Sequence, residues 1–374
     1  MSRAEIAKEE RKMNSIKQIE VIYNNFLVGH LALTKEGLCA FEYSAAWLAS
    51  GFSISPFELP LRSGVFVARP RPFNGGFGVF DDCLPDGWGQ LILDRYLQLQ
   101  GINPRSLTIL DRLALVGSTG RGALEFRPDK SVITEQEYAD FENLAVEAER
   151  ILDSDDYTGE GIEEFQHRGG SPGGARPKIF TRYDGKEWLV KFRAKRDPVH
   201  IGREEYKHSL LAQQCGIEMP ETHLFDDKYF GVQRFDRTPE GKLHVVSIAG
   251  LICADYRIPS IDYSHIFQVC AALTHNMAEL WKVYRLMVFN YLIENKDDHA
   301  KNFAFIYSDG EWHFSPAYDI LPSDGMNGYR TTSINDSIEP SKADLIAVAT
   351  KAGLNKKDAE EIFESIHATI RIHG

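Results

Sequence analysis

The segment ENKDDHAKNFAF, residues 294–305, places charged and amide side chains between two strongly apolar stretches. Within it, Asp297 and Asn302 are five residues apart, and a further acid, Asp319, follows an expected hairpin. Because a hairpin returns on itself, Asp319 near its end can lie close to Asn302 near its start. A carboxylate can accept a proton from a hydroxyl group, and Asp and Asn oxygens are ligands for Mg²⁺. The three residues therefore suit phosphoryl transfer, which needs a base and a metal ion that neutralises charge on the phosphates.

Two other interpretations of these residues stay open at this point. A solvated loop, in which Asp and Asn side chains cap turns, also accounts for the spacing of Asp297 and Asn302. The other interpretation is a metal-dependent hydrolase. Its possible ligands are Asp297, Asp298, His299 and His313. Pairings such as HxxxH, which place two ligands on one helix face, are missing from the sequence.

Other parts of a phosphoryl-transfer site occur upstream in a consistent order. HRGGSPGGARPK, residues 167–178, is a Gly-rich loop before a strand, and its backbone N–H groups can approach phosphates. It lacks the GxxxxGK[ST] spacing of a Walker P-loop. Lys191 lies on a predicted strand after this loop, and Glu205 on the following helix can hold it. GVQRFDR, residues 231–237, ends a strand where backbone groups could contact adenine.

Turn residues and apolar periodicity predict the elements that position these groups. Hairpins are expected at Asn24-Asn25, Asp184-Gly185 and Asp309-Gly310, because Asn, Asp and Gly tolerate positive φ. Helices are expected over residues 86–101, 202–216 and 279–295, and short strands over 222–227 and 228–235. The chain beyond Arg237 is expected to be largely helical. The acidic, linker-like sequence between residues 129 and 161 predicts a domain boundary.

Composition limits the class of protein. The chain has 374 residues, of which 43% are hydrophobic and 26% charged, as in a globular protein of two domains. A net charge of -12 argues against a protein-wide basic surface for nucleic acid. Five scattered cysteines without a CxxC favour a reducing compartment, and no apolar run reaches the roughly 18 residues of a membrane span. We therefore expect a cytoplasmic protein with no membrane contact.

The motifs together resemble the HipA-type serine/threonine kinases, the toxin half of bacterial toxin–antitoxin pairs. The resemblance rests on SPGGARPK, WLVKF, EEY, VQRFDR, NKDDHAKNFAF and SPAYDI, and extends into the first half through VGHLAL, LPDGWGQLILDR and VGSTGRGALEFRP. It implies an α+β fold: a two-lobed, protein-kinase-like domain with a mostly helical C-lobe, preceded by an N-terminal α/β domain. The expected boundaries are 16–130 for the N-terminal domain and 156–374 for the kinase-like domain. Within the latter, the N-lobe spans about 160–236 and the C-lobe about 237–374.

The resemblance also implies roles for individual residues. Asp297 is expected to be the catalytic base, with Asn302 and Asp319 as Mg²⁺ ligands. The expected nucleotide-binding residues are Ser171, Gly173, Gly174, Ala175, Lys178, Lys191, Glu205, Gln233, Phe235 and Asp236. Of these, Gln233 and Phe235 match hinge positions whose backbone contacts adenine. Ser171 is also the expected autophosphorylation site, where a phosphate would disfavour the nucleotide-cradling loop. Asp298, a second acid beside the base, is expected to cap a turn rather than hold metal.

The implied cofactors are ATP and Mg²⁺, and the implied partners follow the same resemblance. They are a HipB-like helix-turn-helix antitoxin, operator DNA bound only through the antitoxin complex, and a protein substrate of the translation machinery, such as an aminoacyl-tRNA synthetase. Two alternatives remain. The chain could be a weakly active corepressor subunit that joins an antitoxin on operator DNA, or a small-molecule kinase, since such enzymes share the base, the Asn and the metal-binding Asp.

Overall fold

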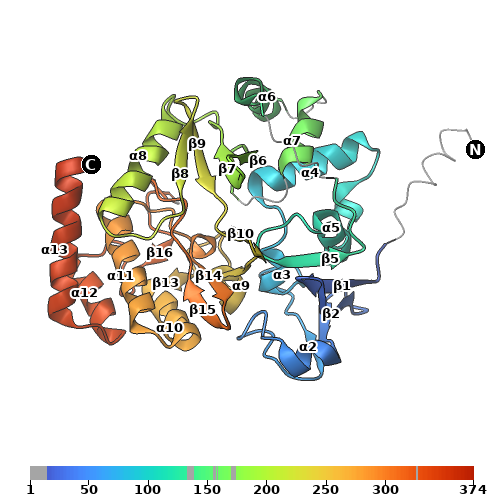
Figure 1. The fold of residues 1–374 in the computed structure, drawn as a ribbon, viewed down its shortest axis with the longest axis horizontal. Helices are drawn as coiled ribbons and strands as arrows, with labels where there is room; N and C mark the ends of the chain where they lie inside the picture. Colours follow the sequence, from blue (N-terminus) through green and yellow to red (C-terminus); the bar gives the residue numbers. More distant parts are fainter. Residues whose placement is uncertain (1–14, 133–138, 155–156, 158, 170–173, 326) are drawn as a thin grey trace, which may run out of the picture. The chain divides into compact units, whose positions relative to one another are not determined.

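The computed structural model describes residues 15–132, 139–154, 157, 159–169, 174–325 and 327–374 (Figure 1). These residues form two compact units. The first runs up to Ile54 and from Leu59 to Val199, and the second comprises Ser55–Glu58 and His200–Gly374. Ser171 and Gly173 lie outside the described residues.

The first unit contains an antiparallel five-stranded sheet in the order β4-β3-β2-β1-β5. Its strands are β1 (Gln18–Tyr23), β2 (Phe26–Leu33), β3 (Cys39–Tyr43), β4 (Val65–Val67) and β5 (Leu124–Arg127). The predicted β1–β2 hairpin is confirmed: Asn24 and Asn25 form the turn with φ of 46° and 66°. Alternation along the strands buries Val21, Leu31 and Phe41, which form the core under the sheet.

Helices and a second hairpin complete the first unit. The helices are α2 (Ala45–Ser50), α3 (Gly78–Asp81), α4 (Gly87–Leu99), α5 (Ile109–Val116), α6 (Phe141–Asp153) and α7 (Gly161–Gly169), with a 3₁₀ turn at Pro104–Ser106. Figure 1 shows α7 beside α4 and β6, and α5 beside β5. The hairpin of β6 (Lys178–Tyr183) and β7 (Lys186–Lys191) turns at Asp184 and Gly185, as predicted. Trp188 and Val190, which alternate along β7, are both buried.

The second unit is largely helical, as expected. Its helices are α8 (Ile201–Gln214), α9 (Ile248–Ile252), α10 (Tyr263–Thr274), α11 (Met277–Leu292), α12 (Lys342–Lys351) and α13 (Lys356–His373), with a 3₁₀ turn, η2, at Ala300–Asn302. The predicted buried helix is α11, whose residues Tyr284, Met287 and Phe289 are fully enclosed. It packs against α10, α12 and α13. A hydrogen bond from the Tyr284 hydroxyl to the carbonyl oxygen of Ala359 (2.9 Å) joins it to α13.

Short strands of the second unit position the charged loop after α11. They are β8 (Thr222–Phe225), β9 (Tyr229–Gln233), β10 (Arg237–Thr238), β11 (Gly241–Lys242), β12 (His244–Ser247), β13 (Ile261–Asp262), β14 (Ala304–Ser308), β15 (Glu311–Phe314) and β16 (Thr332–Ser333). The β14–β15 hairpin turns at Asp309 and Gly310, as predicted. Its first strand also pairs with β12, a strand not predicted from the sequence. β13 and β16 pair in parallel.

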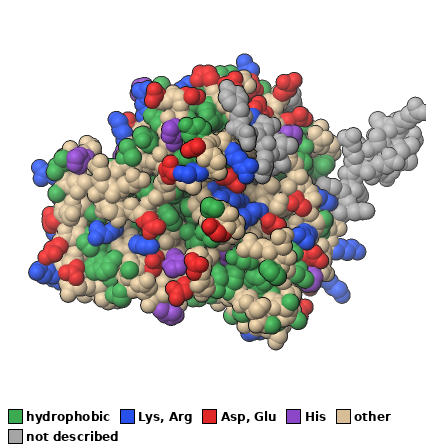
Figure 2. Space-filling view, in the orientation of Figure 1, with side chains coloured by type: hydrophobic (Ala, Val, Ile, Leu, Met, Phe, Trp, Pro, Cys, Tyr) green, Lys and Arg blue, Asp and Glu red, His purple; other side chains and the backbone are tan. Residues whose placement is uncertain are grey.

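The surface gives two further findings. On the face shown in Figure 2, acidic and basic side chains are interspersed. Among the helices that the structure describes, none is long and apolar enough to cross a membrane.

Candidate active site

The charged segment is a loop that leaves the end of α11 at Glu294, whose φ of 58° turns the chain out of the helix. Two adjacent acids in this loop face opposite ways: Asp297 is exposed, whereas Asp298 is completely buried. His299 precedes η2, and its Nδ1 accepts a hydrogen bond from the backbone N–H of Lys301 (3.2 Å). The loop thus presents one carboxylate to solvent and uses the other inside the protein.

Hydrogen bonds join two of the three predicted chemical residues of this unit and hold the neighbour of the third against the same loop. The side-chain N–H of Asn302 donates to the carbonyl oxygen of Asp297 (2.9 Å). The β14–β15 hairpin then carries the chain back, and the Tyr318 hydroxyl donates to the carbonyl oxygen of Lys301 (2.7 Å). Asp319 follows Tyr318 directly, is exposed and has a φ of 59°. Asn302 is thus bonded to Asp297, and the residue before Asp319 is bonded to the same loop. The approach of Asp319 itself to the other two residues stays a prediction.

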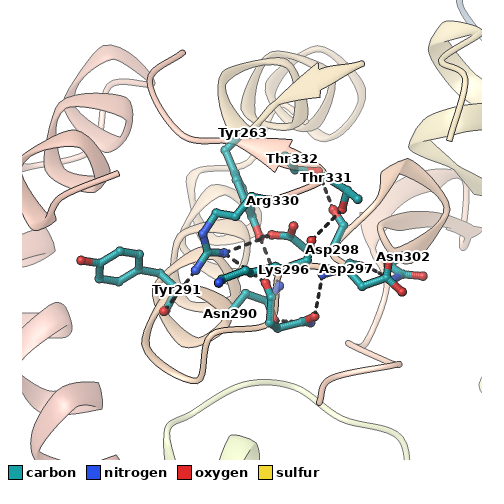
Figure 3. Close-up of polar contacts among 11 residues, drawn as sticks. Tyr263, Asn290, Tyr291, Lys296, Asp297, Asp298, Asn302, Arg330, Thr331 and Thr332 are labelled. Carbon is teal, nitrogen blue, oxygen red and sulfur yellow. Dashed lines mark hydrogen bonds and ion pairs between the residues drawn. The ribbon is translucent and has the colours of Figure 1, made fainter. Parts of the chain in front are cut away.

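Asp298 does not cap a turn, so the expectation for this residue is wrong. Figure 3 shows its carboxylate within the protein, where Oδ2 accepts a hydrogen bond from the Tyr263 hydroxyl (2.8 Å) and lies 4.0 Å from Nη1 of Arg330. Burial raises the pKa of the Asp298 carboxyl to about 7, and the Arg330 charge acts in the opposite direction. The pKa of Tyr263 is also raised, first by burial and then by the nearby Asp298 charge. The side chain that caps the loop is that of His299.

A chain of buried amides links this cluster to the backbone of Asp297. Asn290, on α11, donates from Nδ2 to the Tyr263 hydroxyl oxygen (3.1 Å), and Asn295 donates from Nδ2 to Oδ1 of Asn290 (3.1 Å). Oδ1 of Asn295 in turn accepts the backbone N–H of Asp297 (3.2 Å). Each amide both donates and accepts, which fixes the orientation of the side chains. The position of Asp297 is therefore set from inside the helical core.

Residues 330–332 donate hydrogen bonds to backbone carbonyl oxygens of the loop that holds Asp297 and Asp298 (Figure 3). Arg330 donates from Nη1 to the carbonyl oxygen of Asn295 (3.0 Å) and from Nη2 to that of Tyr291 (3.2 Å). The backbone N–H of Thr331 donates to the carbonyl oxygen of Lys296 (2.9 Å), and the Thr332 hydroxyl donates to that of Asp298. These bonds satisfy backbone carbonyls that the sharp loop leaves outside regular structure.

The oxygen atoms near Asp297 fit a hard cation better than a soft one. Because Asn302 uses its amide nitrogen on Asp297, its amide oxygen is turned away from that bond, and Asp319 offers an exposed carboxylate. Amide and carboxylate oxygens are the ligands that Mg²⁺ accepts, often with water and phosphate oxygens. In the described parts of the chain, no group of three or more His, Cys, Asp or Glu side chains could hold a metal ion. The residues proposed for a hydrolase do not gather into such a group.

The predicted hinge residues have different environments. Phe235 has backbone groups that could contact a ligand, whereas Asp236 forms an ion pair with Arg234. The Phe235 ring stacks on Tyr318, with centroids 5.8 Å apart. Among the described residues, none forms a hydrogen bond with the backbone N–H or C=O of Phe235, so both groups can serve a ligand. The backbone N–H of Gln233 donates to the backbone carbonyl oxygen of Glu221 (2.8 Å). Asp236 is buried and paired with Arg234 through two hydrogen bonds (3.1 and 2.9 Å), which holds the turn after β9.

The first unit contains two buried lysines that were predicted to bind nucleotide. Lys178 and Lys191 are direct cross-strand neighbours in the β6–β7 hairpin, with exposures of 4% and 9%. Two neighbouring lysines place two positive charges side by side, which suits an anion with several negative charges. Lys191 is therefore not the exposed edge residue that strand lysines usually are. Glu205, on α8 of the second unit, is buried at 5%. Its pairing with Lys191 stays a prediction.

The described end of the Gly-rich loop lies over Lys178. A Cβ atom placed on Gly174 would lie 2.7 Å from Nζ of Lys178, and Ala175 is exposed. The backbone N–H of Gly174 donates to Oδ1 of Asp86, before α4. In this conformation the N–H of Gly174 is used within the protein rather than offered to a phosphate.

Comparison with known families identifies the chain. Residues 170–373, more than half of the chain, match the family of HipA-like C-terminal domains, and residues 19–127 match that of HipA N-terminal domains. The chain belongs to the HipA family. The resemblance expected from the sequence is thereby confirmed.

Individual HipA relatives cover most of the chain. The serine/threonine-protein kinase toxin HipA of Shewanella oneidensis is 22% identical over 372 residues, which cover 86% of this chain and 79% of that protein. The Sinorhizobium fredii protein Y4dM is 27% identical over 320 residues, covering 79% and 75%. A solved structure of Shewanella oneidensis MR-1 HipA with HipB and operator DNA matches with a TM-score of 0.68 at 20% identity, covering 95% of this chain and 91% of that one. This match confirms the α+β, kinase-like fold class.

Several residues of the HipA-family site were not predicted. Asn295 lies inside the quoted ENKDD motif, and its five-residue spacing from Asn290 across a helix end is a signal that sequence reasoning could have used. Tyr263 and Arg330 reach the loop from other segments and carry no such signal, because only the fold brings them near Asp298. Asp86 was expected only to open a helix.

Proposed function

We propose that this HipA-family chain is a Mg²⁺–ATP-dependent serine/threonine protein kinase that acts as a bacterial toxin in the cytoplasm. The observation that carries the proposal is the Asn302–Asp297 hydrogen bond, together with the Tyr318–Lys301 hydrogen bond that brings the residue before Asp319 to the same loop. The buried Lys178–Lys191 pair supports it independently, because it suits a polyphosphate. The relative named serine/threonine-protein kinase toxin supports the reaction class.

Each residue has a distinct task in this proposal. The exposed Asp297 carboxylate orients the acceptor hydroxyl and takes its proton as the phosphoryl group transfers from ATP. Asn302 and Asp319 would hold Mg²⁺, which neutralises charge on the phosphates. Lys191 and Lys178 bind phosphate oxygens, and the backbone of Phe235 contacts adenine. Protein groups around the loop keep Asp297 in place, so that the reacting atoms meet in the correct orientation.

We further propose that the kinase silences itself through Ser171. A phosphate on this serine adds about two negative charges to the Gly-rich loop at neutral pH. Those charges repel the ATP phosphates and disfavour the conformation that cradles them. Autophosphorylation then limits the toxic activity.

The decisive experiment is intact mass with site mapping before and after incubation with Mg²⁺–ATP. Starting from unmodified protein, we expect one added phosphate on Ser171 in the wild type and none in Asp297→Asn. Transfer that persists in Asp297→Asn would exclude Asp297 as the base. Rapid phosphorylation of a sugar or an aminoglycoside, without transfer to protein, would favour the small-molecule kinase instead.

The proposed partners are a HipB-like helix-turn-helix antitoxin and a protein substrate of the aminoacyl-tRNA synthetase class. The similar Shewanella HipA was solved with HipB and operator DNA, which supports an antitoxin partner of that kind. The net charge of -12 favours DNA contact only through the antitoxin. Operator binding should therefore require the antitoxin in an electrophoretic shift assay. An inactive chain that still joins the antitoxin on DNA would favour the corepressor role.

A further inference from the structure

The described ends of the chain on either side of residues 170–173 are both held by one turn of the first unit. On the C-terminal side, Gly174 uses both backbone groups: its N–H donates to Oδ1 of Asp86, and its carbonyl oxygen accepts the N–H of Trp88 (3.0 Å). On the N-terminal side, the Trp88 ring packs edge-on against Phe165 of α7, with centroids 5.0 Å apart. The turn Asp86–Trp88, which we call the DGW turn, thus contacts both flanks of the Gly-rich loop.

Asp86 of the DGW turn does not make the hydrogen bond that an N-cap residue usually makes within its own helix. Asp86 occupies the N-cap of α4, where an Asp side chain normally accepts an N–H from its own first turn. Here its side chain caps none of those groups and bonds to Gly174 instead. Trp88 lies in the first helical turn, whose N–H groups have no partner within the helix, and the Gly174 carbonyl supplies one. The carbonyl oxygen of Gly174 therefore caps one N–H group in the first turn of α4.

Both glycines in this contact are required by geometry. Gly87 has a φ of 47°, and a Cβ atom there would overlap the carbonyl oxygen of Gly174. Gly174 has a φ of 93°, a backbone conformation that residues with a Cβ atom rarely adopt. A glycine without support samples many conformations, so the two hydrogen bonds restrict Gly174 to one. Lys178 lies directly against it and is held in the same arrangement.

We propose that the DGW turn is an intramolecular brace that pre-organises residues 174–178, the described end of the Gly-rich loop, with Asp86 as a positioning residue for ATP binding. This inference rests on the proposed kinase function. Asp86 lies within the stretch that matches HipA N-terminal domains, and Gly174 within the stretch that matches HipA-like C-terminal domains. The N-terminal region therefore contributes to the affinity for ATP. Residues 174–178, once fixed in place, lose less conformational freedom when a ligand binds.

The test compares three full-length variants with the wild type. Asp86→Ala removes the acceptor for the Gly174 N–H, whereas Asp86→Asn keeps an oxygen acceptor without the charge. Asp94→Ala is the matched control, because Asp94 lies on the same helix and pairs with Arg112 (2.9 Å) rather than with the loop. The affinity for Mg²⁺–ATP is measured by titration calorimetry. Hydrogen exchange of peptides covering residues 84–90 and 174–178 is measured without nucleotide.

We expect Asp86→Ala to bind Mg²⁺–ATP roughly tenfold more weakly, as expected for the loss of one hydrogen bond to a charged group. Exchange should rise in both peptides of this variant. Asp86→Asn should recover most of the affinity and of the protection, and Asp94→Ala should match the wild type in both assays.

Unchanged exchange in Asp86→Ala would overturn the brace, whether or not the protein binds ATP. Tighter binding by Asp86→Ala would also overturn it, since Asp86 would then compete with a phosphate for Gly174. A wild type that binds no ATP, with the exchange results as expected, would refute the kinase proposal and restrict the brace to a structural role.

Discussion

The side-chain amide of Asn302 donates a hydrogen bond to the main-chain carbonyl oxygen of Asp297, 2.9 Å away. This bond joins the proposed metal ligand to the proposed base through the backbone of the base. It also leaves the amide oxygen, rather than the amide nitrogen, for the metal ion of the proposed site. A substitution of Asn302 can therefore disturb two functions, and the choice of replacement separates them.

Asn302→Asp keeps an oxygen ligand but loses the donor to Asp297, whereas Asn302→Ala loses both. We expect both variants to lower kcat by about tenfold or more, because the base loses its tether. Only Asn302→Ala should require a much higher Mg²⁺ concentration for half-maximal activity. A Mg²⁺ titration at fixed ATP measures this difference. Identical Mg²⁺ requirements in the two variants would argue against Asn302 as a metal ligand.

Asp297→Asn should lower the rate of phosphoryl transfer by about 10²- to 10⁴-fold, because the amide cannot accept the hydroxyl proton. Affinity for Mg²⁺–ATP should change little, since the base faces the acceptor rather than the nucleotide. Single-turnover kinetics and calorimetry measure the two quantities. Asp309→Asn, in the exposed turn of the β14–β15 hairpin, is the control and should behave as the wild type, because Asn also tolerates its φ of 52°.

Tyr318→Phe removes the hydroxyl that reaches the Lys301 carbonyl but keeps the ring that stacks on Phe235. We expect a loss of about 1 kcal/mol in the free energy of unfolding, the typical contribution of one hydrogen bond. We also expect a severalfold drop in kcat, because Asp319 loses its anchor to the loop. Tyr307→Phe, on β14, is the control. If Tyr318→Phe keeps full kcat, the hydroxyl contact does not position Asp319.

The buried Asp298 predicts a specific pH dependence of stability. Its folded-state pKa of about 7 lies above the ordinary value of 3.8, so the folded protein holds this proton more tightly than the unfolded chain. The resulting stabilisation is complete below about pH 4 and is lost as the pH rises through 7. Between pH 6 and 8, the unfolding free energy of the wild type should fall by about 1.4 kcal/mol relative to Asp298→Asn. Urea titrations at the two pH values test this, and parallel curves for the two proteins would contradict it.

Arg330→Met should be strongly destabilising at pH 8, by about 3 kcal/mol or more, because it leaves the Asp298 charge buried without its cation. The carbonyl oxygens of Asn295 and Tyr291 also lose their donors. Adding Asp298→Asn removes the buried charge, so the double variant should be more stable than Arg330→Met alone. A double-mutant cycle of urea unfolding measures the coupling. Strictly additive effects would show that the two side chains act independently.

Local chemistry explains which parts of the fold could be predicted. The three hairpin turns followed from Asn, Asp and Gly, whose backbones accept positive φ, and α8 and α11 followed from their apolar periodicity and end signals. The return of the chain at Tyr318 to the loop that holds Asp297 and Asn302 could be predicted, because one hairpin separates the two segments. Strand β12 was missed, because only its pairing with β14 reveals it.

The role of Asp298 was missed for a related reason. This second acid beside the base was expected to cap a turn, but its environment is set by Tyr263 and Arg330, which lie 35 and 32 residues away along the chain. Likewise, the contact between Asp86 and Gly174 spans 88 residues. Contacts of this length depend on the packing of whole elements, which periodicity and turn residues do not encode.

The buried amides, hydroxyl, carboxylate and guanidinium around Asp298 also constrain how this protein can change over evolutionary time. Because each group is the partner of another, a lone replacement leaves a buried polar atom unsatisfied, at a cost that a single surface change does not carry. Drift at Tyr263, Asn290 and Asn295 is therefore expected to be concerted rather than independent. These positions should be inherited as a set among close relatives, even where the exposed residues around them have diverged.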